Sequence, residues 1–508
     1  MNNFYITTPI YYCNDQPHVG HAYSNIACDI LARFNKLQNK NVFFLSGTDE
    51  HGQKVEKAAQ KTKMQPQEFV NNMSKSFKDL IPALGCEIND FIRTTEKRHK
   101  IAAQYLWKKL EDNKHIYLSN YEGWYSIRDE AFYSENELTR IDSSFIAPSG
   151  STVEWVKEES YFFKLSEWQN KLISFYEDNP ESIKPKSRYN EVLSFIKSGL
   201  TDLSISRTTF KWGIPVPNNE KHVMYVWIDA LCNYLTAIGY PDTSSKKFTN
   251  FWPAIHVIGK DILRFHSVYW PAFLMAADLD PPVKVFAHGW WTNEGQKISK
   301  SLGNVIDPYD IISNYGLDQF RFFLFREVPF GNDGDFSKNS IANRVNADLS
   351  NNFGNLIQRV TSFINKNCNN VVENIFTLKN EDQKILDFSK KKITKYSQYM
   401  NNQEIDKAIK EIFEMITETN IYVDKQAPWV LKKNDIKRMN LVLSISIQLI
   451  KRATLMLFPV IPSSCKKIFK QLNINYADLN FDNISMLDTK PIIINDANPI
   501  FPRIETND

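Results

Sequence analysis

The fold is decided by residues 4–45, which read FYITTPIYYCNDQPHVGHAYSNIACDILARFNKLQNKNVFFL. The stretch begins with a short apolar run from Phe4 to Ile10 and ends with a second from Val42 to Leu45. Between them, apolar residues recur every three or four positions, at Ile26, Ile30, Phe34 and Leu37. This spacing predicts a helix with one buried face. Strand, helix and strand in succession predict a βαβ unit, and therefore part of a parallel nucleotide-binding sheet.

The rest of the chain divides into a sheet region that is interrupted once and a helical region. Residues 115–222 are rich in Tyr, Ser, Glu and Lys and indicate an insertion. After it, the apolar runs 254–258 and 283–287 flank a predicted helix over residues 262–277, so the sheet resumes. Beyond residue 345, apolar residues return at helical spacing, which predicts a helix bundle. We expect an α/β Rossmann-like parallel-sheet domain with an inserted domain, followed by an all-α bundle.

The composition is that of a soluble globular protein, with 43% hydrophobic and 23% charged residues in 508. The formal net charge is only +3, so a nucleic acid partner must be held by local basic patches. The six cysteines include no pair at the spacing of a zinc knuckle, so we expect no structural zinc and no metal-ligating set. No signal peptide and no apolar run of about 18 residues is found, which favours a cytoplasmic protein without membrane contact.

The first motif that carries chemistry is Pro17-His18-Val19-Gly20-His21, at the start of the predicted helix. His18 and His21 share a face of the first turn, where helix N–H groups already favour a phosphate. Gly20 has no side chain and lets an adenine ring lie close to the backbone. Two histidines near a helix start can also be a cap and a surface residue. Their position after a parallel strand favours ATP binding.

The second motif is Lys297-Ile298-Ser299-Lys300-Ser301, in a loop after a later strand. Lys297 and Lys300 on a mobile loop can close on the β and γ phosphates and stabilise the charge of departing pyrophosphate. A short run of Lys and Ser alone is more often a solvated loop. The lysine motif therefore indicates phosphate binding only in combination with the histidine pair.

Together the two motifs resemble the HIGH and KMSKS signatures of class I aminoacyl-tRNA synthetases, with Val for Ile and Ile for Met. Further segments resemble the methionyl-tRNA synthetase family along most of the chain. They are Thr7 to Tyr12 (TPIYY within it), Gly47 to Gly52 (GTDEHG), Val226 to Leu231 (VWIDAL) and Ile258 to His266 (IGKDILRFH). The resemblance implies ATP-dependent activation of L-methionine to methionyl adenylate, release of pyrophosphate, and transfer to the 3′-terminal ribose of tRNA(Met).

The resemblance implies residue roles by position. Catalysis is expected from His18, His21, Lys297 and Lys300; ATP binding also from Gly20, Gly259, Lys260, Asp261 and Ser299. Methionine is expected to contact Ile10, Tyr12, Asp49, Trp227, Ala230, Leu231, Tyr234, Ile262, Phe265 and His266. Asp49 can pair with the substrate ammonium, and aromatic walls suit a thioether. Trp227 and Tyr234 are seven apart and would share one helix face. Each aromatic could instead be ordinary core, His266 a satisfied core histidine, and Asp261 a helix N-cap.

The helical third resembles the anticodon-binding bundle of the family, with Asn355, Arg359 and Trp429 at the anticodon-reading positions. A Trp beside two polar side chains can stack an unpaired base while they read its edge; it could also hold helices together. The expected domains are the two catalytic halves 1–114 and 223–320, the connective insertion 115–222 without zinc, the stem-contact linker 321–346 and the anticodon domain 347–508. Mg²⁺ is expected with ATP, both initiator and elongator tRNA(Met) as partners, and a monomer.

Two other classes of protein stay open from the sequence. Another class I synthetase is one, although the insertion is too short for a large editing domain and the cysteines of a zinc-bearing pocket are missing. A nucleotidylyltransferase or an inactive RNA-binding protein on the same scaffold is the other. The presence of His18, His21, Lys297 and Lys300 together favours an active synthetase.

Overall fold

The computed structural model describes residues 3–129, 131–133, 135–141, 144–297, 305–373, 377–488 and 490–505. The chain forms two compact units. The sheet unit contains the described residues of Asn3–Pro17 and Phe43–His288, and the helical unit contains His18–Val42 and the described residues of 289–505. Each unit therefore combines segments that are far apart in the sequence.

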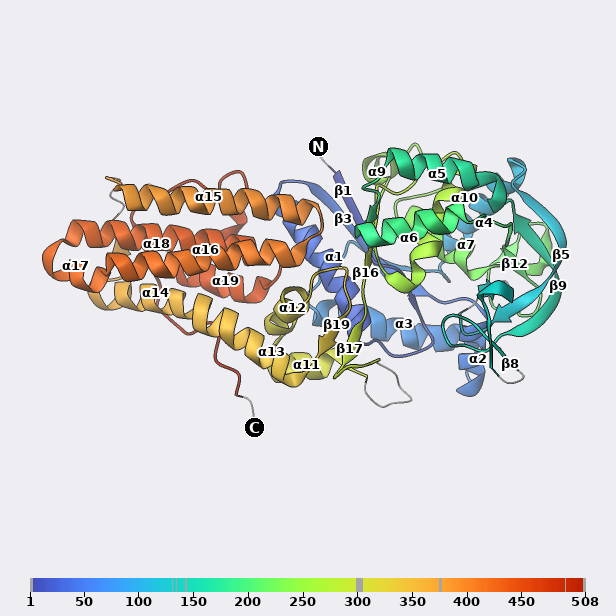
Figure 1. Ribbon diagram of the computed structural model, residues 1–508, viewed down its shortest axis with the longest axis horizontal. Helices are drawn as coiled ribbons and strands as arrows, with labels where there is room; N and C mark the ends of the chain where they lie inside the picture. Colours follow the sequence, from blue (N-terminus) through green and yellow to red (C-terminus); the bar gives the residue numbers. More distant parts are fainter. Residues whose placement is uncertain are drawn as a thin grey trace. The chain divides into compact units, whose positions relative to one another are not determined.

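The sheet unit contains a parallel sheet. In order of neighbours, its strands are β10 (Ile183–Lys184), β16 (Lys284–His288), β15 (Ile255–Gly259), β1 (Asn3–Thr7), β3 (Asn41–Asp49) and β2 (Tyr11–Tyr12), and β4 (Asp90–Arg93) also pairs with β3. Of these strands, β1, β3 and β16 are labelled in Figure 1. The pairs β10–β16, β16–β15, β15–β1, β3–β2 and β3–β4 are parallel. Every residue of β3 after Asn41 is buried, as in a strand covered on both faces. The predicted parallel sheet is confirmed.

The helices of the sheet unit are α2 (Gln53–Lys61), α3 (Pro66–Ala83), α4 (Lys97–Asp112), α5 (Gln169–Asp178), α6 (Lys186–Lys197), α7 (Val226–Leu231), α8 (Asn233–Thr236), α9 (Lys246–Phe251) and α10 (Trp270–Ala276). The helix predicted over residues 262–277 is not regular. It is a 3₁₀ turn, Lys260–Ile262, then a π-helical stretch, Phe265–Tyr269, then α10. Such π-helical stretches occur often at functional sites, because they re-aim side chains.

The predicted insertion is mostly antiparallel. Its long strands β5 (Ile116–Ser126) and β9 (Glu154–Phe163) pair along their length, flanked by β6 (Ala131–Tyr133) and β11 (Leu203–Ser204). Smaller pairings join β7 (Thr139–Ile141) to β8 (Ser144–Ile146), and β12 (Ser206–Arg207) and β13 (Pro215–Val216) to β14 (Asn219–Met224). One strand of residues 115–222 behaves differently, because β10 pairs in parallel with β16 and so extends the main sheet.

The helical unit begins with α1 (Val19–Leu37), the helix predicted from Ile26 to Leu37. It continues with β17 (Trp291–Asn293), β18 (Gln296–Lys297), α11 (Pro308–Tyr315), α12 (Leu317–Arg326), β19 (Gly334–Phe336), α13 (Lys338–Arg344) and a π-helical stretch, Val345–Gly354. The bundle follows with α14 (Asn355–Asn367), α15 (Asn380–Asn401), α16 (Ile405–Gln426), α17 (Pro428–Asn434), α18 (Ile436–Leu457) and α19 (Pro462–Gln471), and the short strands β20 (Val371–Val372) and β21 (Ile492–Ile493) pair beside it. The predicted bundle is confirmed, with α15, α16 and α18 side by side (Figure 1).

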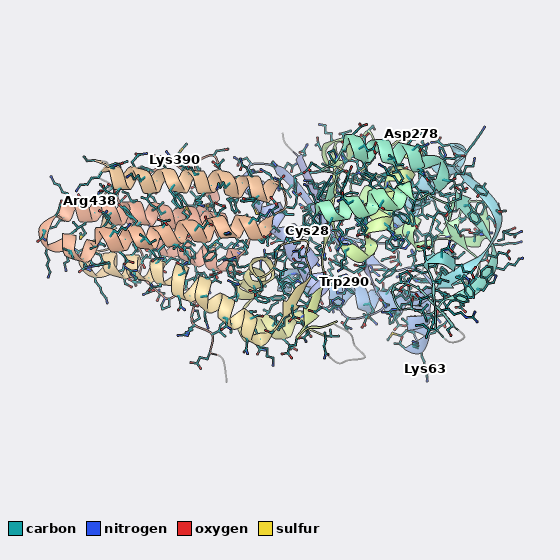
Figure 2. The ribbon with its side chains drawn as sticks, in the orientation of Figure 1. Cys28, Lys63, Asp278, Trp290, Lys390 and Arg438 are labelled. Atoms are coloured by element: carbon teal, nitrogen blue, oxygen red, sulfur yellow. The ribbon has the colours of Figure 1, made fainter. Side chains whose placement is uncertain are left out.

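Two buried ion pairs tie the helical unit together. Arg321 of α12 donates to Asp29 of α1 at 2.6 Å and to the carbonyl of Val460 at 2.8 Å. Arg438 at the start of α18, labelled in Figure 2, donates to Asp382 of α15 at 2.8 Å. α18 is long and apolar enough to cross a membrane, but 94% of its apolar window is buried inside the bundle. It is the central core helix of that bundle.

Candidate active site

The histidine pair stands at the N-terminus of α1. His18 is the N-cap residue, and its Nδ1 accepts a hydrogen bond from the backbone N–H of Gly20 at 3.0 Å. The Nδ1 atom of His21 accepts from the backbone N–H of His18 at 3.0 Å. Because both Nδ1 atoms are acceptors, both ring protons reside on Nε2. The ring centroids are 3.9 Å apart, so two N–H donors stand side by side at the positive end of a helix.

Burial and the neighbouring His18 lower the pKa of His21 well below its ordinary value, so its ring is neutral near pH 7. A neutral imidazole donates a hydrogen bond to phosphate without bringing a charge of its own. Gly20 has a structural role beyond the one predicted. A Cβ at position 20 would lie 2.9 Å from Cε1 of His18, so glycine is needed for the His18 ring to take its cap position.

The described backbone on either side of the lysine motif contacts α1, directly after the motif and through the paired strand β17 before it. The backbone of Lys297 ends β18, which pairs with β17 through the turn Glu294-Gly295, where both residues have positive φ. The predicted ligands Ser299 and Lys300 lie outside the described residues, and so does the Lys297 side chain. Where the chain is described again, the carbonyl of Ile306 accepts from the backbone N–H of Val19 at 3.2 Å. On the other side, Trp291 of β17 meets Tyr23 of α1 edge-on at 5.7 Å. The backbone at Ile306 is therefore bonded to α1, and the hairpin that ends at Lys297 packs against α1 through Trp291.

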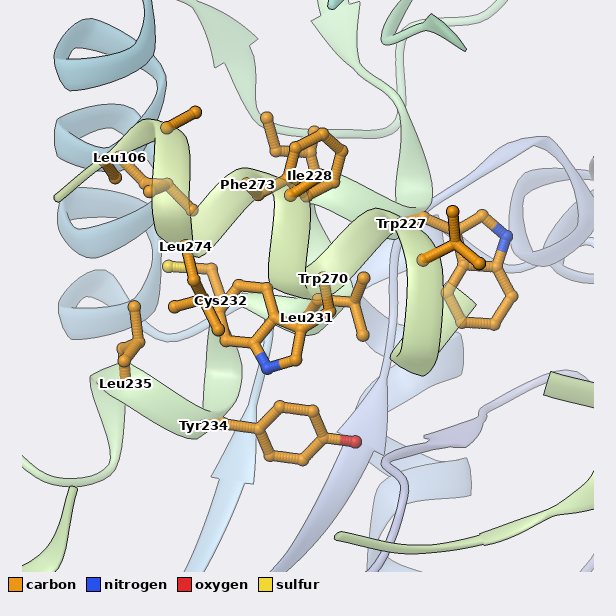
Figure 3. Close-up of a cluster of buried hydrophobic side chains, with 14 of the residues drawn as sticks. Leu106, Trp227, Ile228, Leu231, Cys232, Tyr234, Leu235, Trp270, Phe273 and Leu274 are labelled. Atoms are coloured by element: carbon orange, nitrogen blue, oxygen red, sulfur yellow. The ribbon is translucent and has the colours of Figure 1, made fainter. Parts of the chain in front are cut away.

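Most of the predicted methionine residues belong to one apolar cluster of the sheet unit or pack against it. Figure 3 shows Trp227, Leu231 and Tyr234 within this cluster. Trp227, Leu231 and Tyr234 belong to its buried core, and the partly buried Ile10, Tyr12, Ile262 and Phe265 pack against it. Ala230 is buried between Asp229 and Leu231 on α7. Asp49, 3% exposed, ends β3 and is the register partner of Tyr12. The structure thus brings together residues from four separate stretches of the chain, 10–12, 49, 227–234 and 262–265.

Aromatic contacts shape this cluster. The rings of Trp227 and Phe265 are stacked, with centroids 3.7 Å apart and an angle of 7° between planes. The prediction that one continuous helix carries Trp227 and Tyr234 is wrong. The helix is interrupted at Cys232, between α7 and α8. Both residues still meet at His266, since Trp227 lies edge-on to its ring at 6.3 Å and Tyr234 bonds to it. The indole N–H of Trp227 is buried and lacks a partner among the described residues, which leaves one donor for a ligand.

His266 is a neutral acceptor in this cluster. Its Nδ1–H donates to the carbonyl of Ile262 at 3.0 Å, so Nε2 accepts from the hydroxyl of Tyr234 at 2.8 Å. Burial lowers the pKa of His266 to about 4, although the Ile262 carbonyl and Asp261 act in the opposite direction. The sequence left two roles open for His266, a core histidine with satisfied hydrogen bonds or a residue of the methionine pocket. The two roles are compatible, because the same hydrogen bonds also orient Tyr234.

The segment Gly259-Lys260-Asp261 follows β15 at the carboxyl edge of the sheet. Asp261 lies inside the 3₁₀ turn, and Gly259 occupies the N-cap position, so the alternative of Asp261 as a helix N-cap is not what the structure shows. The Asp261 carboxylate folds back over Gly259, where a Cβ would lie 2.5 Å from Oδ1. This edge is where α/β sheets bind nucleotides.

The predicted anticodon residues lie in the bundle. The guanidinium of Arg359 is 5.7 Å from the ring centroid of Trp429, which is 44% exposed, and it pairs with Asp424. Asn355 begins α14, one turn before Arg359. A cavity of about 150 Å³ opens here, lined by Arg359, Val360, Phe363, Val423, Pro428, Trp429 and Leu443. An exposed indole beside a held guanidinium can stack a base and bond its edge.

Sequence reasoning missed a basic cavity of about 730 Å³ in the sheet unit. Lys54, Lys57 and Lys61 of α2 line it together with Arg128 and a single acid, Glu154. The three lysines recur at helical spacing, and this periodicity was the available signal. Lys54 also lies over the Tyr12 ring, at 4.6 Å, so the cavity borders the aromatic cluster. Among the described residues no group of three His, Cys, Asp or Glu side chains could hold a metal ion.

Two family profiles together match nearly the whole chain. Residues 4–142 and 139–361 match the family described as tRNA synthetases class I (M), and residues 374–505 match the anticodon binding domain of methionyl tRNA ligase. The methionine–tRNA ligase of Rickettsia conorii is 53% identical, covering 99% of this chain and 100% of its own. That of Mesorhizobium japonicum is 51% identical over 92% of this chain and 91% of its own.

Solved structures agree with these sequence matches. Mycobacterium tuberculosis methionyl-tRNA synthetase in complex with methionyl-adenylate superposes with a TM-score of 0.96 at 42% identity, covering 99% of this chain and 100% of that one. The apo form of the same enzyme gives a TM-score of 0.90 at 40% identity, with 100% and 99% coverage.

Proposed function

The chain belongs to the methionyl-tRNA synthetase family of class I aminoacyl-tRNA synthetases, and from this premise we propose how its residues divide the work. It acts as a methionine–tRNA ligase, which activates L-methionine with ATP and transfers the methionyl group to tRNA. The observation that carries this proposal is the hydrogen bond between Val19 and Ile306, which joins the backbone that follows the lysine motif to the helix that presents the histidine pair.

Adenylate formation rests on phosphate contacts. The Nε2–H groups of His18 and His21 donate to phosphate oxygens of ATP at the positive end of α1. Lys297, Ser299 and Lys300 close on the same phosphates and stabilise the negative charge that builds on pyrophosphate as the methionine carboxylate attacks the α-phosphorus. Gly259, Lys260 and Asp261 hold the nucleoside at the edge of the sheet, with Asp261 accepting from ribose hydroxyls. No covalent enzyme intermediate is needed.

Methionine recognition rests on the aromatic cluster. The carboxylate of Asp49 pairs with the substrate ammonium, and the stacked rings of Trp227 and Phe265 form a wall for the thioether. Ile10, Tyr12, Ala230, Leu231 and Ile262 complete an apolar surface. The neutral pair of Tyr234 and His266 adds polarity without charge, which suits an uncharged side chain. Shape and this fixed geometry carry the selection, since one missing methyl group is worth only about 1–3 kcal/mol.

Mg²⁺ enters with ATP in this proposal, because phosphate oxygens and water supply most ligands of Mg²⁺ in nucleotide sites and no dedicated cage is needed. The ion supplies neutralisation of phosphate charge when it is bound. We assign no structural zinc to the insertion. Its tip is instead held by Asp129, whose carboxylate accepts from the hydroxyls of Ser151 at 2.5 Å and Tyr133 at 3.0 Å.

The partner is tRNA(Met), both initiator and elongator. Arg359, Asn355 and Trp429 read the anticodon, with Trp429 stacking one base and Asp424 orienting Arg359. The basic cavity along α2 holds phosphates of the same RNA close to the aminoacyl site. The protein works as a monomer in the cytoplasm. The catalytic halves, insertion, linker and anticodon domain keep the proposed boundaries at residues 114, 222, 320 and 346.

The test is exchange of radiolabelled pyrophosphate into ATP with each of the twenty amino acids. Only methionine is expected to support strong exchange, and the same preparation should then charge tRNA(Met). Strong exchange with another amino acid would assign a different synthetase, and RNA binding without any exchange would favour an inactive relative.

A further inference from the structure

One carboxylate with no assigned role lies on the same helix as Trp227, Ala230 and Leu231. Asp229 is on α7, two residues after Trp227 and directly before Ala230, and it is fully buried. Its Oδ2 bonds to Nδ1 of His51 at 2.7 Å, and its Oδ1 bonds to Nε2 of His99 at 2.8 Å. Both histidines are buried as well, at 2% and 0% exposure. Burial acts to raise the pKa of Asp229, but the two imidazoles outweigh it and lower the pKa to about 2. The group is therefore an ionised acceptor with both oxygens engaged.

These bonds join the segments that carry the proposed methionine contacts. His51 lies two residues after Asp49 in the loop that follows β3. His99 is on α4, and its other nitrogen bonds at 3.2 Å to the hydroxyl of Thr236 on α8, the helix that carries Tyr234. Through one carboxylate, the loop of Asp49, the helix of Trp227 and the helix of Tyr234 are held to one another.

The loop of His51 is held from its other side too. The indole of Trp212 donates to the carbonyl of Glu50 at 2.6 Å, and the N–H of Gly52 donates to the carbonyl of Trp212 at 2.9 Å. The Glu50 carboxylate accepts from Arg93 of β4 at 2.6 Å. The residues on both sides of His51 are therefore bonded to Trp212 or β4, and the His51 side chain itself is bonded to Asp229.

Stability alone does not explain a buried carboxylate at this point. Replacing a buried ionic network by apolar residues of similar volume is often neutral or stabilising. Charge-assisted hydrogen bonds are short and directional, and so they fix distances that apolar packing leaves adjustable. Binding and catalytic geometry must be held to within about 0.5 Å, which apolar contacts alone do not guarantee.

We propose that Asp229 is a positioning residue for methionine binding, which acts through His51 and His99 to hold Asp49, Trp227 and Tyr234 in one geometry. The inference rests on the proposed function, because it takes these residues as the methionine contacts. Asp229 itself contacts neither methionine nor ATP. Replacement of Asp229 should weaken methionine binding and leave ATP binding nearly unchanged.

The experiment compares pyrophosphate exchange by Asp229→Asn, His99→Leu and His99→Gln in the full chain. Asparagine leaves one imidazole without an acceptor, so we expect the KM for methionine to rise at least tenfold and the KM for ATP to change less than twofold. His99→Leu should give the same split. His99→Gln keeps an N–H donor for Asp229, so it should raise the KM for methionine less than threefold.

His222→Gln is the matched control, because His222 is equally buried in the sheet unit and its bonds go to Ser206 at 2.9 Å and Glu159 at 3.2 Å, neither of which is on α7. A purely structural role for Asp229 predicts an unchanged KM for methionine in the folded variants, or the same rise in His222→Gln; either result overturns the proposal. If Asp229→Asn does not fold, the two His99 variants decide, and equal KM values for them also overturn it. Failure of the proposed function would look different, since the unmodified protein would then show no methionine-dependent exchange.

Discussion

Lowering the pH from 7.5 to 5 should reduce the free energy of local unfolding around His266. The size of this reduction follows from the pKa of His266 in the folded and unfolded chains. The unfolded chain binds a proton at this histidine below pH about 6.5, whereas burial keeps the folded ring neutral down to about pH 4. The pKa of His266 is lower in the folded chain than in the unfolded chain. The contribution of the neutral His266 ring to stability is therefore complete above pH 6.5 and is lost as the pH falls toward 4. At pH 5 these two pKa values correspond to a loss of about 2 kcal/mol.

The assay is hydrogen exchange by mass spectrometry on peptides that span residues 255–277, which reports the free energy of local opening. The reference is His266→Gln, whose side-chain carbonyl can accept from Tyr234 and whose N–H can donate to the Ile262 carbonyl, but which does not titrate. Comparing the two proteins at each pH cancels the intrinsic exchange rate. It also cancels titrating groups that do not interact with His266. The pKa of His256 is lowered mainly by burial and less by His266, so the larger cause is kept in both proteins.

We expect the opening free energy of the unmodified protein, relative to His266→Gln, to fall by about 2 kcal/mol between pH 7.5 and pH 5. The difference should be nearly constant above pH 7. Parallel curves for the two proteins across this range would refute the reasoning, because His266 would then titrate in the folded state as it does in the unfolded chain. The same result would also refute the assignment of the Tyr234 hydroxyl as the donor to His266.

Three further outcomes are expected. Lys300→Ala should slow adenylate formation at least a hundredfold in single-turnover measurements and leave methionine binding nearly unchanged; equal losses in both would contradict a role in stabilising departing pyrophosphate. Trp429→Ala should raise the KM for tRNA(Met) by roughly ten- to a hundredfold, since stacking one base is worth about 1–3 kcal/mol, while pyrophosphate exchange stays the same. Lys57→Glu with Lys61→Glu should weaken tRNA binding and flatten its dependence on salt in filter-binding assays, whereas Lys75→Glu, on α3 and outside the cavity lining, should do neither.

Most elements of the fold could be predicted because their signals are local. The spacing of Ile26, Ile30, Phe34 and Leu37 follows from helix geometry, and α1 covers all four. The same reasoning could not place β10. Two strand residues between the helices α5 and α6 carry no pattern of their own, and only pairing with β16 makes Ile183–Lys184 part of the main sheet.

The candidate site divides in the same way. The histidine motif and the lysine motif are visible as residues, but the bond between Val19 and Ile306 joins positions nearly three hundred residues apart in the chain. The position of the lysine side chains stays a prediction. The single helix expected for Trp227 and Tyr234 was wrong because a local periodicity cannot detect the interruption at Cys232, where packing of α7 and α8 decides the backbone.

The sequence alone determined most strands and helices along the chain, the motif residues and the family resemblance. Each of these depends on neighbours within a few turns of the chain. The tertiary structure decided which of these residues meet and in which charge state. Asp229 finds His51 and His99 across 178 and 130 positions, and His266 is neutral only because folding removes water from its ring. Pairing over such distances and the loss of water are properties of the folded chain as a whole.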